Sequence, residues 1–130
     1  MKTMSIEKDL IALNEKIAEM EQARGLEAIA FFESLLSDQL IFRRASGKVV
    51  GKAGPDGFLE GLNKAGPFSL RRAENIWVTQ LDDRALVTLI VVGTRADDGS
   101  AHRYRNIRLF SRSVDNWVLD LWYNYEVAGT

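Results

Sequence analysis

With 130 residues, no cysteine and a formal net charge of −1, the chain can bury one core without cross-links. It has no thiolate metal ligands, no overall charge that would attract nucleic acid or anionic lipid, and no apolar stretch long enough to span a bilayer. Because Glu7, Lys8 and Asp9 also interrupt the region where a signal peptide needs an apolar run, we predict a single domain over residues 1–130, soluble and cytoplasmic, that binds neither nucleic acid nor a membrane.

Apolar residues recur at helical spacing in the first part of the chain. One stripe predicts a helix from about Ser5 to Arg24, and Gly25 supplies its end. This stripe consists of Ile6, Leu10, Leu13, Ile17 and Met20. A second, shorter stripe continues as far as Leu36, so we expect two helices that meet at a glycine corner.

A short hairpin and a short helix follow in the sequence. Residues 40–44 and 48–52 have strand character on either side of a Ser46-Gly47 turn. Pro55 suits the first turn of a helix, where its missing N–H costs no hydrogen bond, and Gly66-Pro67 ends the apolar side that follows. We therefore expect a peripheral hairpin and a helix of about two turns.

From Phe68 onward the apolar pattern changes to a period of two, which is typical of strands. The predicted strands are Phe68–Leu81, Ala85–Thr94, His102–Ser113 and Trp117–Val127, in antiparallel order. The run Ala85–Val92 is apolar on both faces, so its strand should be central and covered on each side. We predict an α+β fold in which three helices of the N-terminal half pack on a mainly antiparallel sheet, in the order α-α-β-β-α-β-β-β-β.

The last two predicted strands have two faces whose composition depends on the register. If residues 114–116 form a three-residue loop with Asn116 in the left-handed conformation, Ser113 opposes Trp117 and even-numbered residues share one face. The even face then contains Tyr104, Asn106, Arg108, Phe110, Asp120, Trp122 and Asn124. The odd face contains Ile107, Leu109, Leu119, Leu121, Tyr123 and Tyr125. A two-residue turn would shift the pairing by one residue and mix the two faces.

The even face mixes aromatic rings with a cation, a carboxylate and amides, which predicts the wall of a small-molecule pocket. Trp77 joins this face if Asp82-Asp83 is a two-residue turn, because that turn pairs Trp77 with Thr88. In the binding hypothesis Arg108 anchors a carboxylate or enolate, while Trp122 and Trp77 pack against the apolar body of the ligand.

Arg108 and Asp120 fall near each other on the even face, and three interpretations of this pair stay open. The pair can belong to a satisfied polar network in the interior, with hydrogen bonds from Tyr104, Asn106 and Asn124. Arg108 can instead anchor a ligand. Finally, Asp120 can act as a general acid or base whose pKa is raised by burial.

The odd face is too apolar for contact with water once helices cover the other side of the sheet, so we predict a homodimer with sheet against sheet. Eight of the eleven arginines lie between Arg71 and Arg112, which by itself is compatible with a nucleic-acid surface. Because aspartates are interspersed among them, we interpret these arginines as protecting sheet edges and covering apolar neighbours with their stems.

Several segments resemble the nuclear transport factor 2-like superfamily, in particular small SnoaL-like bacterial members, and the match covers nearly the whole chain. The matching residues are Asp38–Phe42, Val49–Lys52, Phe58-Leu59, Arg108–Trp117 and Trp122. The resemblance implies the cystatin-like cone fold, in which a curved sheet and helices enclose a cavity. Arg108 and Asn124 are similar to cavity positions of the calcium/calmodulin-dependent kinase association domain, although that domain has an arginine where this chain has Asn124.

The resemblance leaves the activity open, since the superfamily includes ketosteroid isomerases, dehydratases and polyketide cyclases as well as members that only bind or assemble. Asp38 is a candidate base, but an Asp at a helix end also caps the next turn. His102 is the only histidine and no glycine-rich phosphate loop is present, so we predict no metal site and no cofactor. Our leading hypothesis is a domain that binds a largely apolar, carboxylate- or carbonyl-bearing molecule; an enzyme and a dimerisation module are the alternatives.

Overall fold

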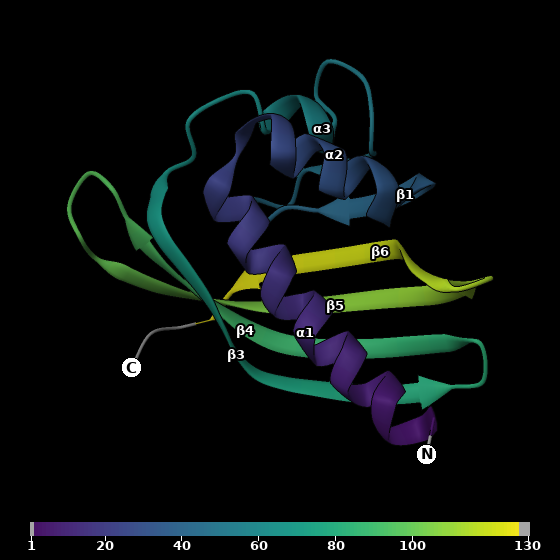
Figure 1. Ribbon diagram of the computed structural model, residues 1–130. Coiled ribbons are helices and arrows are strands. Elements are labelled where there is room, and N and C mark those ends of the chain that lie inside the picture. The colour runs from purple at the N-terminus through teal and green to yellow at the C-terminus, as the bar shows by residue number, and fades with distance from the viewer. Residues whose placement is uncertain (1, 128–130) are drawn as a thin grey trace.

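Three helices accompany a six-stranded sheet in the computed structural model, which describes residues 2–127 (Figure 1). The elements are α1 (Lys2–Ala23), α2 (Gly25–Leu35), β1 (Leu36–Arg43), β2 (Val49–Val50), α3 (Phe58–Gly61), β3 (Phe68–Leu81), β4 (Arg84–Arg95), β5 (Ala101–Ser113) and β6 (Asn116–Glu126). The predicted order is confirmed, and the bounds of the four long strands differ from the prediction by at most one residue at each end. The alternation of apolar residues with a period of two, together with the turn residues, was sufficient to locate these strands.

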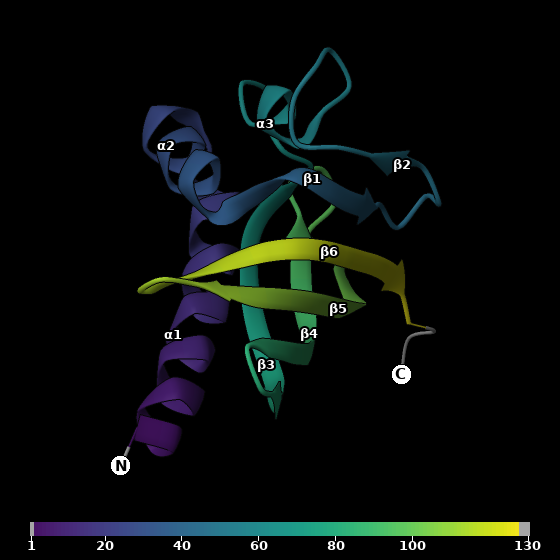
Figure 2. The same cartoon turned by 90° about the vertical axis from the view of Figure 1, so that its right-hand side faces the viewer.

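The strands lie in the order β2-β1-β6-β5-β4-β3. All neighbouring pairs are antiparallel except β1 and β6, which are parallel, so the mainly antiparallel sheet is confirmed. The helices α1 and α2 lie on one side of this sheet, called the inner face below, and no described helix covers the opposite outer face (Figure 2). In Figure 2 the direction of β5 and β6 crosses that of β3 and β4, so the sheet twists into the wall of a cone.

The helices bury their apolar residues against the inner face. α1 packs along β3, and its residues Leu10 and Ile17 are fully buried. At the other side of the core, the rings of Phe42 from β1 and Phe58 from α3 lie 4.7 and 5.2 Å from the ring of Trp122 on β6, measured between centroids. This aromatic cluster holds α3 and β1 against the sheet, because aromatic pairs add to the free energy gained from area burial. Within residues 2–127, none of the helices is both long and apolar enough to cross a membrane.

β4 lies between β5 and the edge strand β3, so it is an interior strand as its sequence predicts, but its outer face is covered only in part, because Leu86 and Thr88 are half-buried. Its inner face carries buried alanine, valine and leucine side chains, while Ile90 and Val92 are also buried although they lie on the outer face. Their cross-strand neighbours include Arg72, Glu74 and Arg103, which form ion pairs with N–O distances of 2.7 and 3.1 Å. The stems of these arginines therefore cover apolar strand residues, as expected for a protected sheet surface.

Lys52 closes the C-terminal end of α2. Its side chain is almost fully buried, and Nζ donates hydrogen bonds to the carbonyl oxygens of Glu33 and Leu36, at 2.9 and 3.0 Å. Nζ also lies 3.2 Å from the Asp38 carboxylate, whose side chain is 94% exposed. Asp38 therefore belongs to an ion pair at the surface, which agrees with the solvated alternative rather than with the candidate base.

We expect Lys52→Met to lower the free energy of unfolding by about 1–3 kcal/mol, because the carbonyl groups at the end of α2 lose their charged donor. Urea denaturation measures this loss. The matched control is Lys48→Met, since Lys48 is well exposed and its ion pair with Asp56 is long, at 3.8 Å. Equal losses in the free energy of unfolding for the two variants would show that the contacts of Lys52 do not stabilise the fold more than an exposed ion pair does.

Candidate ligand-binding cleft

The β5–β6 register combines a wrong prediction with a correct one. The turn contains two residues, Val114 and Asp115, rather than three, and Val114 takes the left-handed conformation with a φ of 47°. Ser113 therefore pairs with Asn116. A β-bulge then restores the predicted register farther along β6, because Phe110 pairs with Leu119 whereas Leu109 pairs with Leu121.

The restored register brings the central even-numbered residues together on the inner face. Arg108 pairs with Trp122, and Asn106 pairs with Asn124. Leu119, expected on the odd face, is instead fully buried on the inner face opposite Phe110, so that assignment is wrong. Its neighbour Asp120 is the additional residue of the bulge and is only half-buried.

Arg108 is completely buried, and its partners are neutral. Nη1 donates to Asn14 Oδ1 at 2.8 Å, Nη2 donates to Asn106 Oδ1 at 3.1 Å, and the guanidinium carbon lies 4.4 Å from the centre of the Trp122 ring. No carboxylate of a described residue forms an ion pair with Arg108, so the proposed pairing with Asp120 is absent. Burial lowers the pKa of Arg108 to about 10, which still leaves the side chain charged at neutral pH.

Two asparagines orient this buried cation. Asn106 Oδ1 also accepts a hydrogen bond from Trp122 Nε1 at 2.6 Å, and Asn14 Nδ2 donates to the carbonyl oxygen of Leu10 at 2.7 Å. Both amide oxygens therefore point to Arg108. Of its three nitrogen atoms, only Nε has no hydrogen-bond partner among the described residues. The arrangement corresponds to the polar-network interpretation, but with Asn14 in the place expected for Asp120.

A cleft of about 360 Å³ opens beside this network. Its lining includes Asn106, Asn124 and Tyr104 from the inner face of β5 and β6. The apolar lining residues are Phe42, Ala45, Phe58, Leu62, Pro67, Phe68 and Val91. The lining also contains the arginines Arg24, Arg44, Arg71 and Arg95, together with Glu21. Arg108 and Trp122 lie behind this surface rather than in it, since both are fully buried.

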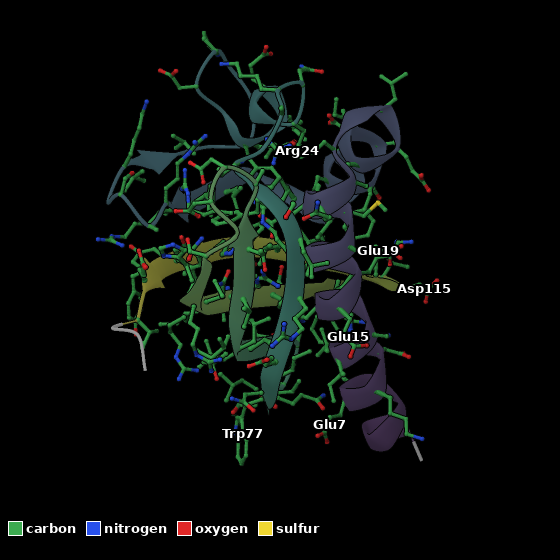
Figure 3. The ribbon with its side chains drawn as sticks, turned by 90° about the vertical axis from the view of Figure 1, so that its left-hand side faces the viewer. Glu7, Glu15, Glu19, Arg24, Trp77 and Asp115 are labelled. Atoms are coloured by element: carbon green, nitrogen blue, oxygen red, sulfur yellow. The ribbon has the colours of Figure 1, made fainter. Side chains whose placement is uncertain are left out.

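Trp77 lies outside the cleft. The predicted two-residue turn at Asp82-Asp83 and the pairing of Trp77 with Thr88 are both present. However, Thr88 pairs in turn with Ile107, an odd-numbered residue of the outer face, and directly opposed residues share a face. The side chain of Trp77 is 71% exposed and extends away from the sheet (Figure 3), so its assignment to the pocket wall is wrong.

Sequence reasoning missed Asn14 and the arginines of the cleft lining. Asn14 had a signal, because it lies four residues after Leu10 and three before Ile17, on the buried stripe of α1. Arg24, Arg44 and Arg71 had none, since they come from the α1–α2 junction, the end of β1 and the first half of β3. Only the topology of the sheet brings such separated residues to one opening.

His102 lies on the inner face, at the start of β5. Its Nδ1 hydrogen-bonds to Glu126 at 2.7 Å, and its Nε2 lies 3.0 Å from Ser100 Oγ. Ser100 Oγ is also 2.7 Å from Asp98 Oδ1. Among the described residues, no group of three or more His, Asp and Glu side chains has an arrangement that could hold a metal ion.

No protein-family model and no curated protein sequence matches the chain. Solved structures do. A protein with a cystatin-like fold from Novosphingobium aromaticivorans superposes with a TM-score of 0.76 at 12% identity, over 99% of this chain and 86% of that chain. The chain has the nuclear transport factor 2-like fold. The CaMKII hub of S. rosetta matches with a TM-score of 0.72 at 17% identity, over 92% and 95% of the two chains. A candidate ketosteroid isomerase from Parabacteroides distasonis matches at 0.67 and 15% identity, over 92% and 86%.

These relatives differ in their assigned roles, one being a hub and another a candidate isomerase. At such low identities the similarity establishes the nuclear transport factor 2-like fold alone, because unrelated functions share it. Function therefore has to be inferred from the cleft and from the outer face of this chain.

Proposed function

We propose that this nuclear transport factor 2-like domain binds a small, largely apolar molecule with a carboxylate or carbonyl group in the cleft. The volume of about 360 Å³ and a lining of aromatic and aliphatic side chains with a few amides are typical of small-molecule sites. The observation that carries the proposal is Asn124, which lines the cleft while its buried Oδ1 has no hydrogen-bond partner among the described residues. An unpaired buried amide oxygen is costly, and a ligand N–H or O–H would satisfy it, whereas Nδ2 of the same amide is the atom that can donate to a ligand carboxylate or carbonyl.

Decanoate is a suitable first probe, because it combines an apolar chain with a carboxylate. We expect it to raise the melting temperature and to quench tryptophan emission in a Trp77→Phe/Trp117→Phe background, which leaves the buried Trp122 as the reporter. Asn124→Leu should weaken binding of decanoate about tenfold, since the hydrogen bond that Asn124 Nδ2 donates to the carboxylate is lost.

Asn63→Leu is the matched control, because Asn63 is exposed and is not among the residues that line the cleft. Its affinity for decanoate should equal that of the parent. The proposal fails if decanoate and its aromatic analogue 1-naphthoate leave the melting temperature unchanged at millimolar concentration.

A second candidate function is self-association through the outer face. The observation that favours it is a continuous apolar row across four strands, formed by Ile41, Leu121, Leu109 and Leu86 in successive cross-strand pairs. Ile41 remains 46% exposed in the isolated chain. An exposed apolar strip of this kind is typical of an interaction surface, and a second copy of the chain offers the complementary strip.

The enzyme alternative depends on an acid or base within the cleft. Glu21 is the one carboxylate among the described residues that line it. Proton transfer of the isomerase, dehydratase or cyclase type needs a group within hydrogen-bonding reach of the reacting carbon or oxygen, so Glu21 is the residue that this alternative assigns as base. The binding proposal, in contrast, uses the amides and apolar walls that make up most of the lining.

A further inference from the structure

Three arginines converge at one side of the cleft without carboxylate partners. Arg24, Arg44 and Arg71 all belong to the lining, and Arg24 lies at the end of α1 next to α2 (Figure 3). The fourth arginine of the lining differs, because Arg95 forms a close ion pair with Asp97 at 2.8 Å. Within residues 2–127, no carboxylate lies within ion-pairing distance of the other three.

The present contacts of these arginines leave donors free. Arg24 donates from Nε to the carbonyl oxygen of Lys64 and from Nη2 to that of Gly61, at 2.9 and 2.6 Å. Its Nη1 takes no part in these bonds. Arg71 donates from Nη1 to the carbonyl oxygen of Glu21 at 2.9 Å, which leaves Nε and Nη2. Arg44 Nε is buried with no partner among the described residues. Arg24 and Arg71 are thus held in position with part of each guanidinium fork unused, and the Arg44 guanidinium forms no hydrogen bond with another described residue.

The three charges are close enough to affect one another. Burial and the positive charges of Arg71 and Arg44 lower the pKa of Arg24, and only Glu21 acts in the opposite direction. Arg24 and Arg44 also line a second hollow of about 280 Å³, whose other charged residues are Lys48, Lys64 and Asp56. A chain with a formal net charge of −1 therefore concentrates positive charge at this opening, where an anion would relieve the repulsion.

We propose that Arg24, Arg44 and Arg71 bind the anionic head group of the ligand, while its apolar body lies along Phe42 and Phe58. This inference rests on the proposed function and reverses the orientation expected from the sequence, in which Arg108 held the acid. Arg108 is fully buried and both of its Nη atoms are already used by asparagines. The guanidinium fork fits carboxylate, sulfonate and phosphate oxygens, so the ligand class is an amphipathic oxyanion.

Two probes with the same aromatic skeleton test this orientation. 8-Anilinonaphthalene-1-sulfonate carries the anionic group, and N-phenyl-1-naphthylamine lacks it. We expect the sulfonate to bind at least about tenfold more tightly to the wild-type protein at low salt, and the preference to decrease as sodium chloride is added. The salt series uses the unaltered chain, so it does not depend on the folding of any variant.

Arginine variants then locate the head group. Arg44→Gln should reduce the preference for the sulfonate about tenfold while affinity for the neutral amine stays the same, and Arg71→Gln should act in the same direction. The control is Arg84→Gln, which removes an exposed arginine that does not line the cleft and should leave the preference intact. Binding of the dye to the outer face would be insensitive to Arg44→Gln, so this variant also identifies the site.

Competition distinguishes the head groups. Decanoate and decyl phosphate should each displace the sulfonate at concentrations at least tenfold below that of decanol, and the more effective of the two identifies a carboxylate or a phosphate ligand. Equal affinity for the sulfonate and the neutral amine would overturn the head-group inference while leaving the cleft as a binding site. If neither probe binds, the proposed function itself fails. A preference that survives Arg44→Gln and Arg71→Gln also overturns the inference.

Discussion

Arg108→Ala is expected to lower the free energy of unfolding by about 3–5 kcal/mol, measured by urea denaturation. The side chain is fully buried, with its guanidinium carbon 4.4 Å from the centre of the Trp122 ring, so truncation leaves a cavity next to the aromatic cluster. It also removes the donor to Asn14 Oδ1, an oxygen that no solvent can reach because Asn14 is itself fully buried. Asn106 is affected less, because Trp122 Nε1 still donates to it.

A double-mutant cycle separates the cavity from the polar network. Arg108→Met keeps most of the side-chain volume, so it should lower the free energy of unfolding less than Arg108→Ala does. The double variant Asn14→Leu/Arg108→Met should lose less free energy of unfolding than the sum of the losses of its two single variants. The physical reason is that each single change leaves a buried polar group unpaired, whereas the double change removes both. A loss below about 1 kcal/mol for Arg108→Ala would contradict this account, because it is smaller than the penalty for one unsatisfied buried group.

The even-numbered side of β5 and β6 could be predicted from the sequence, but not for the reason first given. The register derived from a three-residue loop placed Asn106, Arg108 and Trp122 on one face, and the structure has the corresponding pairs Arg108–Trp122 and Asn106–Asn124. The predicted three-residue loop was wrong, since Val114 rather than Asn116 takes the left-handed conformation. A bulge at Asp120 corrects the register, and its position depends on the burial of Leu119 in the core, which is a tertiary effect that no local pattern reports.

The partners of Arg108 and the charged opening of the cleft could not be predicted in the same way. A carboxylate was expected beside the buried cation, because charges in the interior are generally paired. The structure satisfies the guanidinium with the amide oxygens of Asn14 and Asn106 instead, and Asn14 comes from a helix that is distant in sequence. Arg24 and Arg71 likewise meet only because α1 crosses the strands of the sheet (Figure 1). Contacts of this kind follow from topology and not from spacing along the chain.

The outer face leads to the prediction of a homodimer that Leu121→Arg disrupts. Leu121 occupies the interior of the apolar row, between Ile41 on β1 and Leu109 on β5. An adjacent row contains Arg43, Tyr123, Ile107 and Thr88, so apolar and aromatic side chains continue beside the strip only at Tyr123 and Ile107. Farther along the same face the residues are charged and already form ion pairs with one another, as Arg72, Glu74 and Arg103 do. The strip is therefore bounded by a polar rim, which is the usual anatomy of a protein interface.

Sedimentation velocity of the wild-type protein should give a dimer at tens of micromolar, roughly the regime of a standard-size interface, and Leu121→Arg should give a monomer. The physical reason is that a charge at the middle of the strip would be buried against the partner without a counter-ion. Leu26→Arg is the matched control, because Leu26 is 86% exposed on α2, on the opposite side of the sheet, so this variant should remain dimeric. A wild-type chain that stays monomeric at these concentrations would contradict the interface, and an equal effect of the two arginines would assign the loss to general destabilisation rather than to the strip.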